Sequence, residues 1–206
     1  MIQSAREQRL HIVLLAAVAV VFVWSVVNCH DLLTWGLESF PVVIGAAIVI
    51  PLYRRFRLTN LAYVLICVHA VILLVGAHYT YARVPLFDWI RDAFDLSRNH
   101  YDRVGHFAQG FVPAIIAREV LVRKSPLRGS GWLFFVVICV CLSISAMYEL
   151  LEWAVAVISA DSAVAFLGTQ GDEWDTQKDM ALCLVGSVAA LLMLRGLHDR
   201  QLEEMA

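Results

Sequence analysis

The chain has 206 residues, of which 60 % are hydrophobic and 17 % are charged, and its mean hydropathy is positive. Soluble domains usually carry about 25 % charged residues, so this composition excludes an ordinary soluble domain and indicates a membrane protein. The formal net charge is −2, and we expect the lipid bilayer, and no nucleic acid, as the partner of this chain.

Long apolar segments recur along the chain. An α-helix needs about 20 mostly apolar residues to cross roughly 30 Å of hydrocarbon. Six segments of about this length carry few charges, and little sequence remains between them for a soluble domain. We therefore predict an all-α fold, a polytopic membrane helix bundle in which residues 1–206 form a single integral membrane domain. The predicted spans cover residues 10–28, 37–53, 59–81, 103–122, 131–158 and 178–196.

Basic residues cluster in alternate connections between these spans. Lys and Arg in short loops are retained on the cytoplasmic side of the membrane. The pattern therefore predicts that both termini are cytoplasmic and that segments 82–101 and 159–177 lie outside. The clustered residues are Arg6, Arg9, Arg54, Arg55, Arg57, Arg118, Arg123, Lys124, Arg128, Arg195 and Arg200.

The fourth span opens with the sequence YDRVGHFAQGF, which brings polar groups into the membrane. Asp102 and His106 are four residues apart, so they lie one turn apart on the same face of a helix. Gln109 continues that face one turn deeper. In the predicted orientation this face belongs to the outer leaflet.

The fifth span contains the sequence AMYELLEW, with Glu149 and Glu152 three residues apart and Tyr148 beside them. This span runs outward from residue 131, so Glu149 lies roughly 27 Å along it at about 1.5 Å per residue. That depth again corresponds to the outer leaflet. We therefore expect the glutamates to lie level with His106.

The segment GDEWDTQKDM, residues 171–180, places further acids at the entry to the sixth span. Asp175 and Asp179 are one helical turn apart, and Asp172 precedes them. Glu173 points away from these residues on a helix, and we expect it to be a solvated surface residue. Acids and a histidine from three spans thus meet at one level.

Ionisable groups at this depth cost free energy unless they are paired, protonated, metal-bound or hydrated. A purely structural explanation is that Arg98, Arg103 and Lys178 pair with the acids and hold the helices together. A metal site is the second explanation, because Asp, Glu and His supply oxygen and nitrogen ligands. A proton or cation pathway is the third, although the inner half of the membrane contains few ionisable groups in the predicted topology.

The metal explanation leads to a specific set of expected roles. A divalent ion, Mg²⁺, Mn²⁺ or Zn²⁺, would polarise a phosphate or activate water, and a substrate at the outer leaflet would be a lipid or a lipid-linked headgroup. The alternatives are a protein that binds cations or a partner without turnover, and a proton or cation transporter. The expected metal ligands are Asp102, His106, Asp172, Asp175 and Asp179. The expected catalytic acids are Glu149 and Glu152, and Arg98 and Arg103 are expected to bind the phosphate. Gln109 and Tyr148 are expected to support these groups.

Three motifs give the chain a family resemblance. The succession DxxxHFxxGFxPAxxxRE, YELxEW and GTQGDxWDxQxDM resembles the YjdF-like family of uncharacterised bacterial inner-membrane proteins, most strongly over residues 85–195. The resemblance implies an inner-membrane location and a shared polar site, without an established reaction. A looser resemblance connects the chain to VanZ-like proteins, from which Glu152 and the longer acidic segment depart. In that pattern the polar positions correspond to Asp102, His106, Glu149, Asp175 and Asp179.

Overall fold

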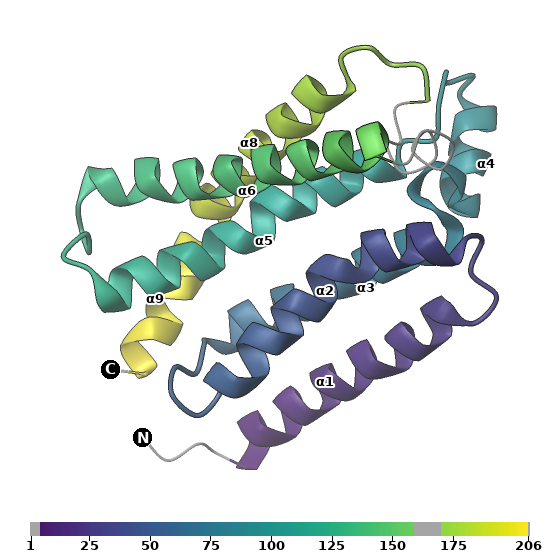
Figure 1. Ribbon diagram of the computed structural model, residues 1–206. Helices are drawn as coiled ribbons and strands as arrows, with labels where there is room; N and C mark the ends of the chain where they lie inside the picture. The colour runs from purple at the N-terminus through teal and green to yellow at the C-terminus, as the bar shows by residue number, and fades with distance from the viewer. Residues whose placement is uncertain (1–4, 159–169, 206) are drawn as a thin grey trace.

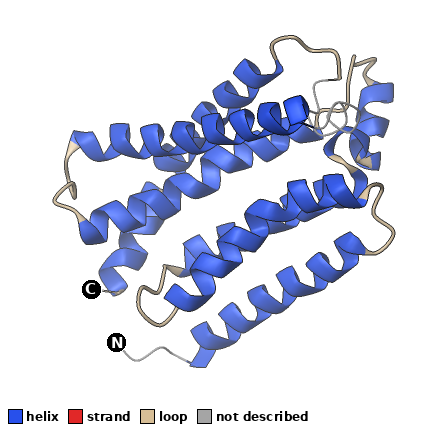
Figure 2. Ribbon diagram, in the orientation of Figure 1, coloured by secondary structure: helices blue, strands red, loops and turns tan. Residues whose placement is uncertain are grey.

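The computed structural model describes residues 5–158 and 170–205, which contain eight α-helices, one short 3-10 helix and no strand (Figures 1 and 2). The prediction of an all-α fold is confirmed. The elements are α1 (Ala5–Val26), α2 (Leu32–Leu52), α3 (Asn60–Tyr79), η1 (Tyr81–Arg83), α4 (Pro85–Ala93), α5 (Tyr101–Lys124), α6 (Gly131–Ile158), α8 (Asp175–Met193) and α9 (Arg195–Glu204).

Five of these helices, α1, α2, α3, α6 and α8, are long and apolar enough to cross a membrane. α5 has 24 residues and so a length of about 36 Å at 1.5 Å per residue, but its charged residues make it less apolar than the other five. It packs against α3, α6 and α8, which shield its polar face from lipid. The chain is a polytopic helical membrane bundle with α5 as its sixth long helix.

The helices form two groups that α3 joins. α1 and α2 pack against α3, whereas α5, α6 and α8 pack against one another, and α3 also contacts α5. The main apolar core lies between α3, α5, α6 and α8 and includes Ile115, Val137 and Leu191. The polar residues described below therefore lie mostly on the group formed by α5, α6 and α8.

The two ends of the bundle differ in their connections (Figure 1). The start of α1 and the end of α9 lie at one end, called here the terminal end, together with the connections 53–59 and 125–130. α4 and the start of α5 lie at the opposite end, called here the α4 end. This arrangement gathers the basic connections at the terminal end, and their cytoplasmic location stays a prediction. Of the predicted outer segment 159–177, residues 159–169 lie outside the described residues.

α5 and α8 approach each other at backbone distance. A Cβ atom added to Gly110 would lie 1.9 Å from the carbonyl oxygen of Cys183, and one added to Gly186 would lie 2.2 Å from that of Phe107. Small residues at such contacts allow membrane helices to pack closely. The contact sets the acidic start of α8 beside the polar first turns of α5.

The start of α2 differs from the predicted limit at residue 37. Asp31 caps the helix, because its side chain accepts a hydrogen bond of 2.7 Å from the backbone N–H of Thr34. Capping by an aspartate satisfies a donor that the first turn leaves unpaired. The helix therefore begins at Leu32, and Glu38 lies inside it as a buried residue.

Candidate functional site

The polar face of α5 carries the first two members of a cluster at the α4 end. Asp102 and His106 face each other one turn apart, with 3.5 Å between Asp102 Oδ1 and His106 Nε2. His106 is buried, and Asp102 is partly buried. The spacing of four residues in the sequence thus predicted their contact correctly.

The second ring nitrogen of His106 has its own partner. Its Nδ1 atom lies 3.2 Å from Oε1 of Gln109, one turn further along α5. When Nδ1 carries the proton it donates to Gln109, and Nε2 then presents a lone pair toward the acids. Gln109 therefore orients the imidazole, which is the supporting role expected for it.

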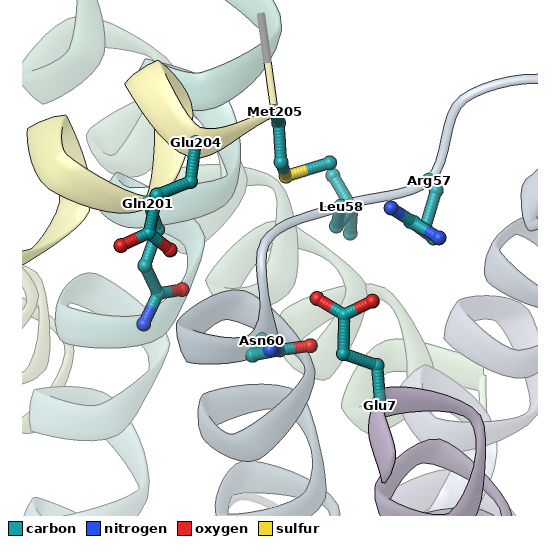
Figure 3. A pocket seen from close by; sticks show the side chains of 7 residues that line it. All are labelled: Glu7, Arg57, Leu58, Asn60, Gln201, Glu204 and Met205. Atoms are coloured by element: carbon teal, nitrogen blue, oxygen red, sulfur yellow. The ribbon is translucent and has the colours of Figure 1, made fainter. Parts of the chain in front are cut away.

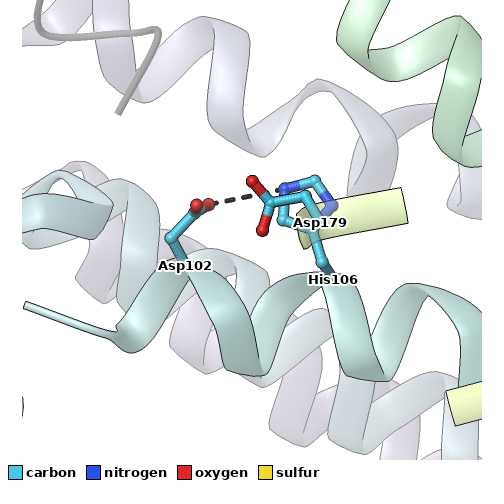
Figure 4. Close-up of side chains that lie close together, drawn as sticks. All are labelled: Asp102, His106 and Asp179. Atoms are coloured by element: carbon cyan, nitrogen blue, oxygen red, sulfur yellow. Dashed lines mark ion pairs between the residues drawn. The ribbon is translucent and has the colours of Figure 1, made fainter. Parts of the chain in front are cut away.

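α8 adds the third member of a compact group. One ligand atom each from Asp102, His106 and Asp179 lies within 4.8 Å of the others, and the three side chains converge on one point (Figure 4). Asp179 is buried. Atoms bound to one Zn²⁺ or Mg²⁺ ion lie about 2.0–2.2 Å from it and so up to about 4.4 Å apart, which makes this spacing close to that of a metal site.

α6 contributes a glutamate to the same place. Oε1 of Glu149 lies 3.7 Å from Nε2 of His106, and this buried oxygen has no hydrogen-bond partner among the described residues. Tyr148 lies beside it, with its ring centroid 6.3 Å from that of His106. Glu152, one turn further along α6, is partly buried. The expected meeting of α5, α6 and α8 is present in the structure.

The two arginines expected to hold a phosphate lie among carboxylates. Arg98 hydrogen-bonds Asp175 and lies 3.6 Å from Asp102, and it is buried. Arg103 lies 2.5 Å from Asp179, 2.6 Å from Asp175 and 3.1 Å from Asp172. Asp175 is therefore held by both guanidinium groups.

Asp172 lies at the edge of the cluster. Lys178 donates to its two carboxylate oxygens at 2.9 and 2.7 Å, and this hydrogen bond holds the pKa of Asp172 below its usual value. Asp172 does not belong to the three-residue group formed by Asp102, His106 and Asp179. Glu173 is exposed, as expected for a solvated surface acid.

A buried asparagine that sequence reasoning missed fixes the start of α5. The Nδ2 group of Asn99 donates to the carbonyl oxygen of Val84 and to Asp88, and its backbone N–H donates to Gln170. α4, α5 and the turn before α8 are thereby joined. Next to it, burial and the nearby guanidinium groups lower the pKa of His100.

Glu38 of α2 is a further acid that sequence reasoning missed. It is buried, and its Oε2 atom has no hydrogen-bond partner among the described residues. Its other oxygen lies 3.5 Å from the backbone nitrogen of Tyr81, whose ring packs against Gly105 beside His106. Glu38 also interacts electrostatically with Asp102, so the N-terminal helices contribute to the cluster.

The terminal end contains a second buried polar network, also missed. Thr59 donates to Glu119 from its backbone N–H at 3.1 Å and from its hydroxyl at 2.8 Å. Arg123 lies 2.7 Å and His198 3.2 Å from the same carboxylate. Arg118 donates to Nδ1 of His198, so the Nε2–H group of that ring is directed at Glu119. This network ties α3, α5 and α9 together.

Ionisable groups are therefore buried at the terminal end as well, where few were expected. The sequence pattern assigned Arg118 to a connection, whereas α5 continues to Lys124 and buries both Arg118 and Glu119. Between His106 and Arg118, the buried residues of α5 carry no polar side chain, and they are Ala108, Gly110, Val112, Ala114 and Ile115. No chain of titratable groups links the two ends along the described face of α5.

Comparisons with known proteins agree with this architecture. The family described as "Predicted membrane protein (DUF2238)" matches residues 10–200. The chain belongs to this family. It is also 48 % identical over 182 residues to the inner membrane protein YjdF of Escherichia coli (strain K12), a match that covers 88 % of this chain and 87 % of that protein. No solved structure matches the chain.

This membership confirms the resemblance drawn from the three motifs. Together with the five apolar helices, it makes the chain a multi-pass protein of the bacterial inner membrane, embedded in the lipid bilayer. Neither description names a reaction or a ligand. The chemistry of the cluster at the α4 end must therefore be argued from its own geometry.

Proposed function

We propose that the cluster at the α4 end binds one divalent cation, Mg²⁺, Mn²⁺ or Zn²⁺, through Asp102, His106 and Asp179. The observation that carries this proposal is their convergence beside a buried oxygen of Glu149 that has no hydrogen-bond partner in the described chain. Leaving a buried carboxylate oxygen without a hydrogen-bond partner costs free energy, and a cation bound beside it would lower that cost.

The balance of charge in the cluster supports the same conclusion. Carboxyl groups outnumber the permanent cations, and the cations contact mainly Asp172, Asp175 and Asp179. A buried excess of acids requires protons or a bound cation to be tolerated in a membrane. The carboxyl groups are Glu38, Asp102, Glu149, Glu152, Asp172, Asp175 and Asp179, and the permanent cations are Arg98, Arg103 and Lys178.

The proposed ligand set is smaller than the one expected from the sequence. Asp172 and Asp175 lie outside the converging group of three and pair with Lys178, Arg98 and Arg103, so we assign them to the support of the site. Arg103 also pairs with Asp179, but Asp179 belongs to the converging group. Asp102, His106 and Asp179 remain as the ligands, with Gln109 orienting the histidine. Glu149 is placed to accept a proton beside them.

We further propose that this site acts on the phosphate of a lipid or a lipid-linked headgroup. A divalent cation supplies charge stabilisation for a phosphate and makes water more acidic. Glu149, 3.7 Å from His106, would take the proton of the water whose oxygen bonds to phosphorus, and Glu152 would add negative charge behind it. The phosphorus–oxygen bond to the leaving alcohol would break, and the alcohol would take up a proton from solvent. The α4 end, which we expect to lie outside, would meet such headgroups in the outer leaflet.

A specific observation favours a second candidate, a protein that binds a cation without turnover. Both arginines expected to hold a phosphate contact carboxylates instead. A hydrolase or transferase would need at least one guanidinium to change partners when substrate binds. A cation-binding protein would need no such change.

Metal titration followed by thermal unfolding tests the binding proposal in purified protein. We expect Mg²⁺, Mn²⁺ or Zn²⁺ to raise the melting temperature of the wild type, because ligands that bind only the folded state stabilise it. Asp102→Asn should lose this shift, whereas Asp95→Asn, an exposed acid at the same end, should keep it. A shift of equal size in both variants would contradict the proposed ligand set.

Turnover is tested separately with Glu149→Gln. The wild type, supplied with metal and phosphatidylglycerol in mixed micelles, should release a phosphorus-containing product detectable by ³¹P NMR. Glu149→Gln should still show the metal-dependent thermal shift. Its rate of product formation should fall about a hundredfold, as expected for removal of a general base. A wild type that binds metal and forms no product would leave the non-enzymatic candidate.

A further inference from the structure

A cavity of about 700 Å³ lies at the terminal end, between the end of α5, the start of α6, the end of α8 and α9. Its volume lies in the range of about 300–1,000 Å³ typical of ligand sites. It is remote from the acidic cluster, which lies at the opposite end of the bundle. The two sites therefore share no residue.

One side of this cavity is cationic. Arg118, Arg128 and Arg195 line it. Arg118 is buried and pairs with Asp199 at 2.5 Å, which fixes that guanidinium. Arg128 is exposed and forms no ion pair with any described residue. The side chain of Arg195 is 71 % exposed, and its Nε atom lies 3.6 Å from Asp199. Two guanidinium groups can therefore face a ligand.

The other side of the cavity is apolar. Leu133, Phe134, Leu191 and Leu192 line it. Leu192 is 71 % exposed and Phe134 is 41 % exposed, so both present carbon surface outward. A water-soluble anion could use the arginines and would gain nothing from this wall. A molecule with a charged head and an apolar tail would use both sides.

The position of the cavity along the bundle matches such a molecule. α6 begins at Gly131 and α8 ends at Met193, so the arginines lie where the membrane-crossing helices end. The apolar residues lie within the ends of the same helices. Basic pockets between membrane helices at this level recognise the headgroups of anionic lipids.

A smaller cavity at the same end has a different character. It measures about 130 Å³ and is lined by residues of α1, α3, α9 and the α2–α3 connection (Figure 3). Glu7, Glu204 and Arg57 face it, so it has no excess of positive charge. It also lacks an extended apolar wall. This contrast directs the inference to the larger cavity.

We propose that the larger cavity binds one anionic phospholipid from the leaflet at the terminal end. Arg128 and Arg195 hold the phosphodiester, and the acyl chains run along Phe134 and Leu192. Besides the three arginines, the cavity is lined by the acids Asp199 and Glu203, so its lining has one positive charge in excess. A phosphatidylglycerol headgroup, with a single negative charge, complements it.

Native mass spectrometry of the full chain, freed of lipid in detergent, tests this proposal. The added probe is dioleoyl phosphatidylglycerol, and inorganic phosphate is added in a parallel experiment. Arg128→Gln with Arg195→Gln should weaken lipid binding by about tenfold, the effect of about 1.4 kcal/mol of lost charge-assisted contacts. Inorganic phosphate should form no retained complex with any variant.

The matched control is Arg54→Gln with Arg55→Gln. These arginines are exposed in the α2–α3 connection at the same end and do not line the cavity. The control should bind the lipid as the wild type does, and both double variants should have the helical circular dichroism of the wild type. Equal loss of lipid in the two double variants would overturn the site and leave only diffuse attraction. Retention of inorganic phosphate by the wild type would overturn the lipid as its ligand.

Discussion

Individual buried charges at the two ends of the bundle differ in how they are compensated. Glu119, at the terminal end, accepts hydrogen bonds from Thr59, Arg123 and His198. Glu38 and Glu149, at the α4 end, each have an oxygen without a hydrogen-bond partner among the described residues. A compensated charge acts as a clamp between helices, whereas an uncompensated one indicates a site.

Glu119→Ala should test the clamp. Removing one partner of a buried ion pair costs roughly 3–5 kcal/mol, and the part of Arg123 that is exposed moderates this cost, so we expect a loss of about 3 kcal/mol in the free energy of unfolding. Unfolding in mixed micelles with increasing SDS measures it. Glu173→Ala, at an exposed acid, should change stability by less than about 0.5 kcal/mol. Equal losses in the two variants would show that Glu119 is not a clamp.

The sequence predicted residues of the site where helical spacing alone sets their contact. The contact between Asp102 and His106 on α5 could be predicted from their four-residue spacing alone. Glu38 lies inside the predicted span 37–53 but was missed, because the groups it meets, Tyr81 and Asp102, are distant in sequence. Asn99 was missed because its bonds link segments distant in sequence, and these have no periodic pattern.

At the scale of elements, the close contact of α5 and α8 positions the site. Gly110→Ala would drive a Cβ atom into the backbone of Cys183, so the two helices must separate. We expect a loss of about 2 kcal/mol in stability, as for overpacking of a dense core, together with weaker metal binding. Thermal unfolding with and without metal measures both effects.

Gly45→Ala is the control for this prediction. Gly45 also lies inside a helix, but a Cβ atom there meets nothing within 4 Å. The control should be neutral or slightly stabilising, because alanine favours a helix by up to about 1 kcal/mol over glycine. If Gly110→Ala behaves like Gly45→Ala, the described approach of α5 and α8 is wrong.

Hydropathy predicted the limits of the long helices well, but it did not predict which helices contact one another. The apolar runs of α3 and α6 gave limits that agree with the structure within two residues. Hydropathy cannot encode which helices touch, because most faces in a membrane are apolar whether they meet lipid or protein. Gly110 and Gly186, which allow α5 and α8 to approach each other, contribute little to a hydropathy pattern.

For the whole molecule, the start of α1, the end of α9 and the basic connections lie together, which gives the bundle a polarity. Reporter fusions test the orientation that follows from it. Fusions at residues 56 and 126 should report the cytoplasm, and a fusion at residue 90 should report the outside, because short basic loops are retained inside. An outside signal at residue 126 would reverse the orientation and place the acidic cluster at the inner leaflet.

The proposed metal ion is held by acids and a histidine from separate helices. Elemental analysis of the protein, purified in detergent without chelator, tests this proposal most directly. We expect about one Mg²⁺, Mn²⁺ or Zn²⁺ per chain, since three converging ligands form one site. His106→Ala with Asp179→Ala should lose this metal, and Asp92→Ala with Asp95→Ala, at exposed acids of the same end, should keep it. Absence of stoichiometric metal from the wild type, with no thermal shift on adding these ions, would contradict the claim and leave the cluster as paired and protonated charges between helices.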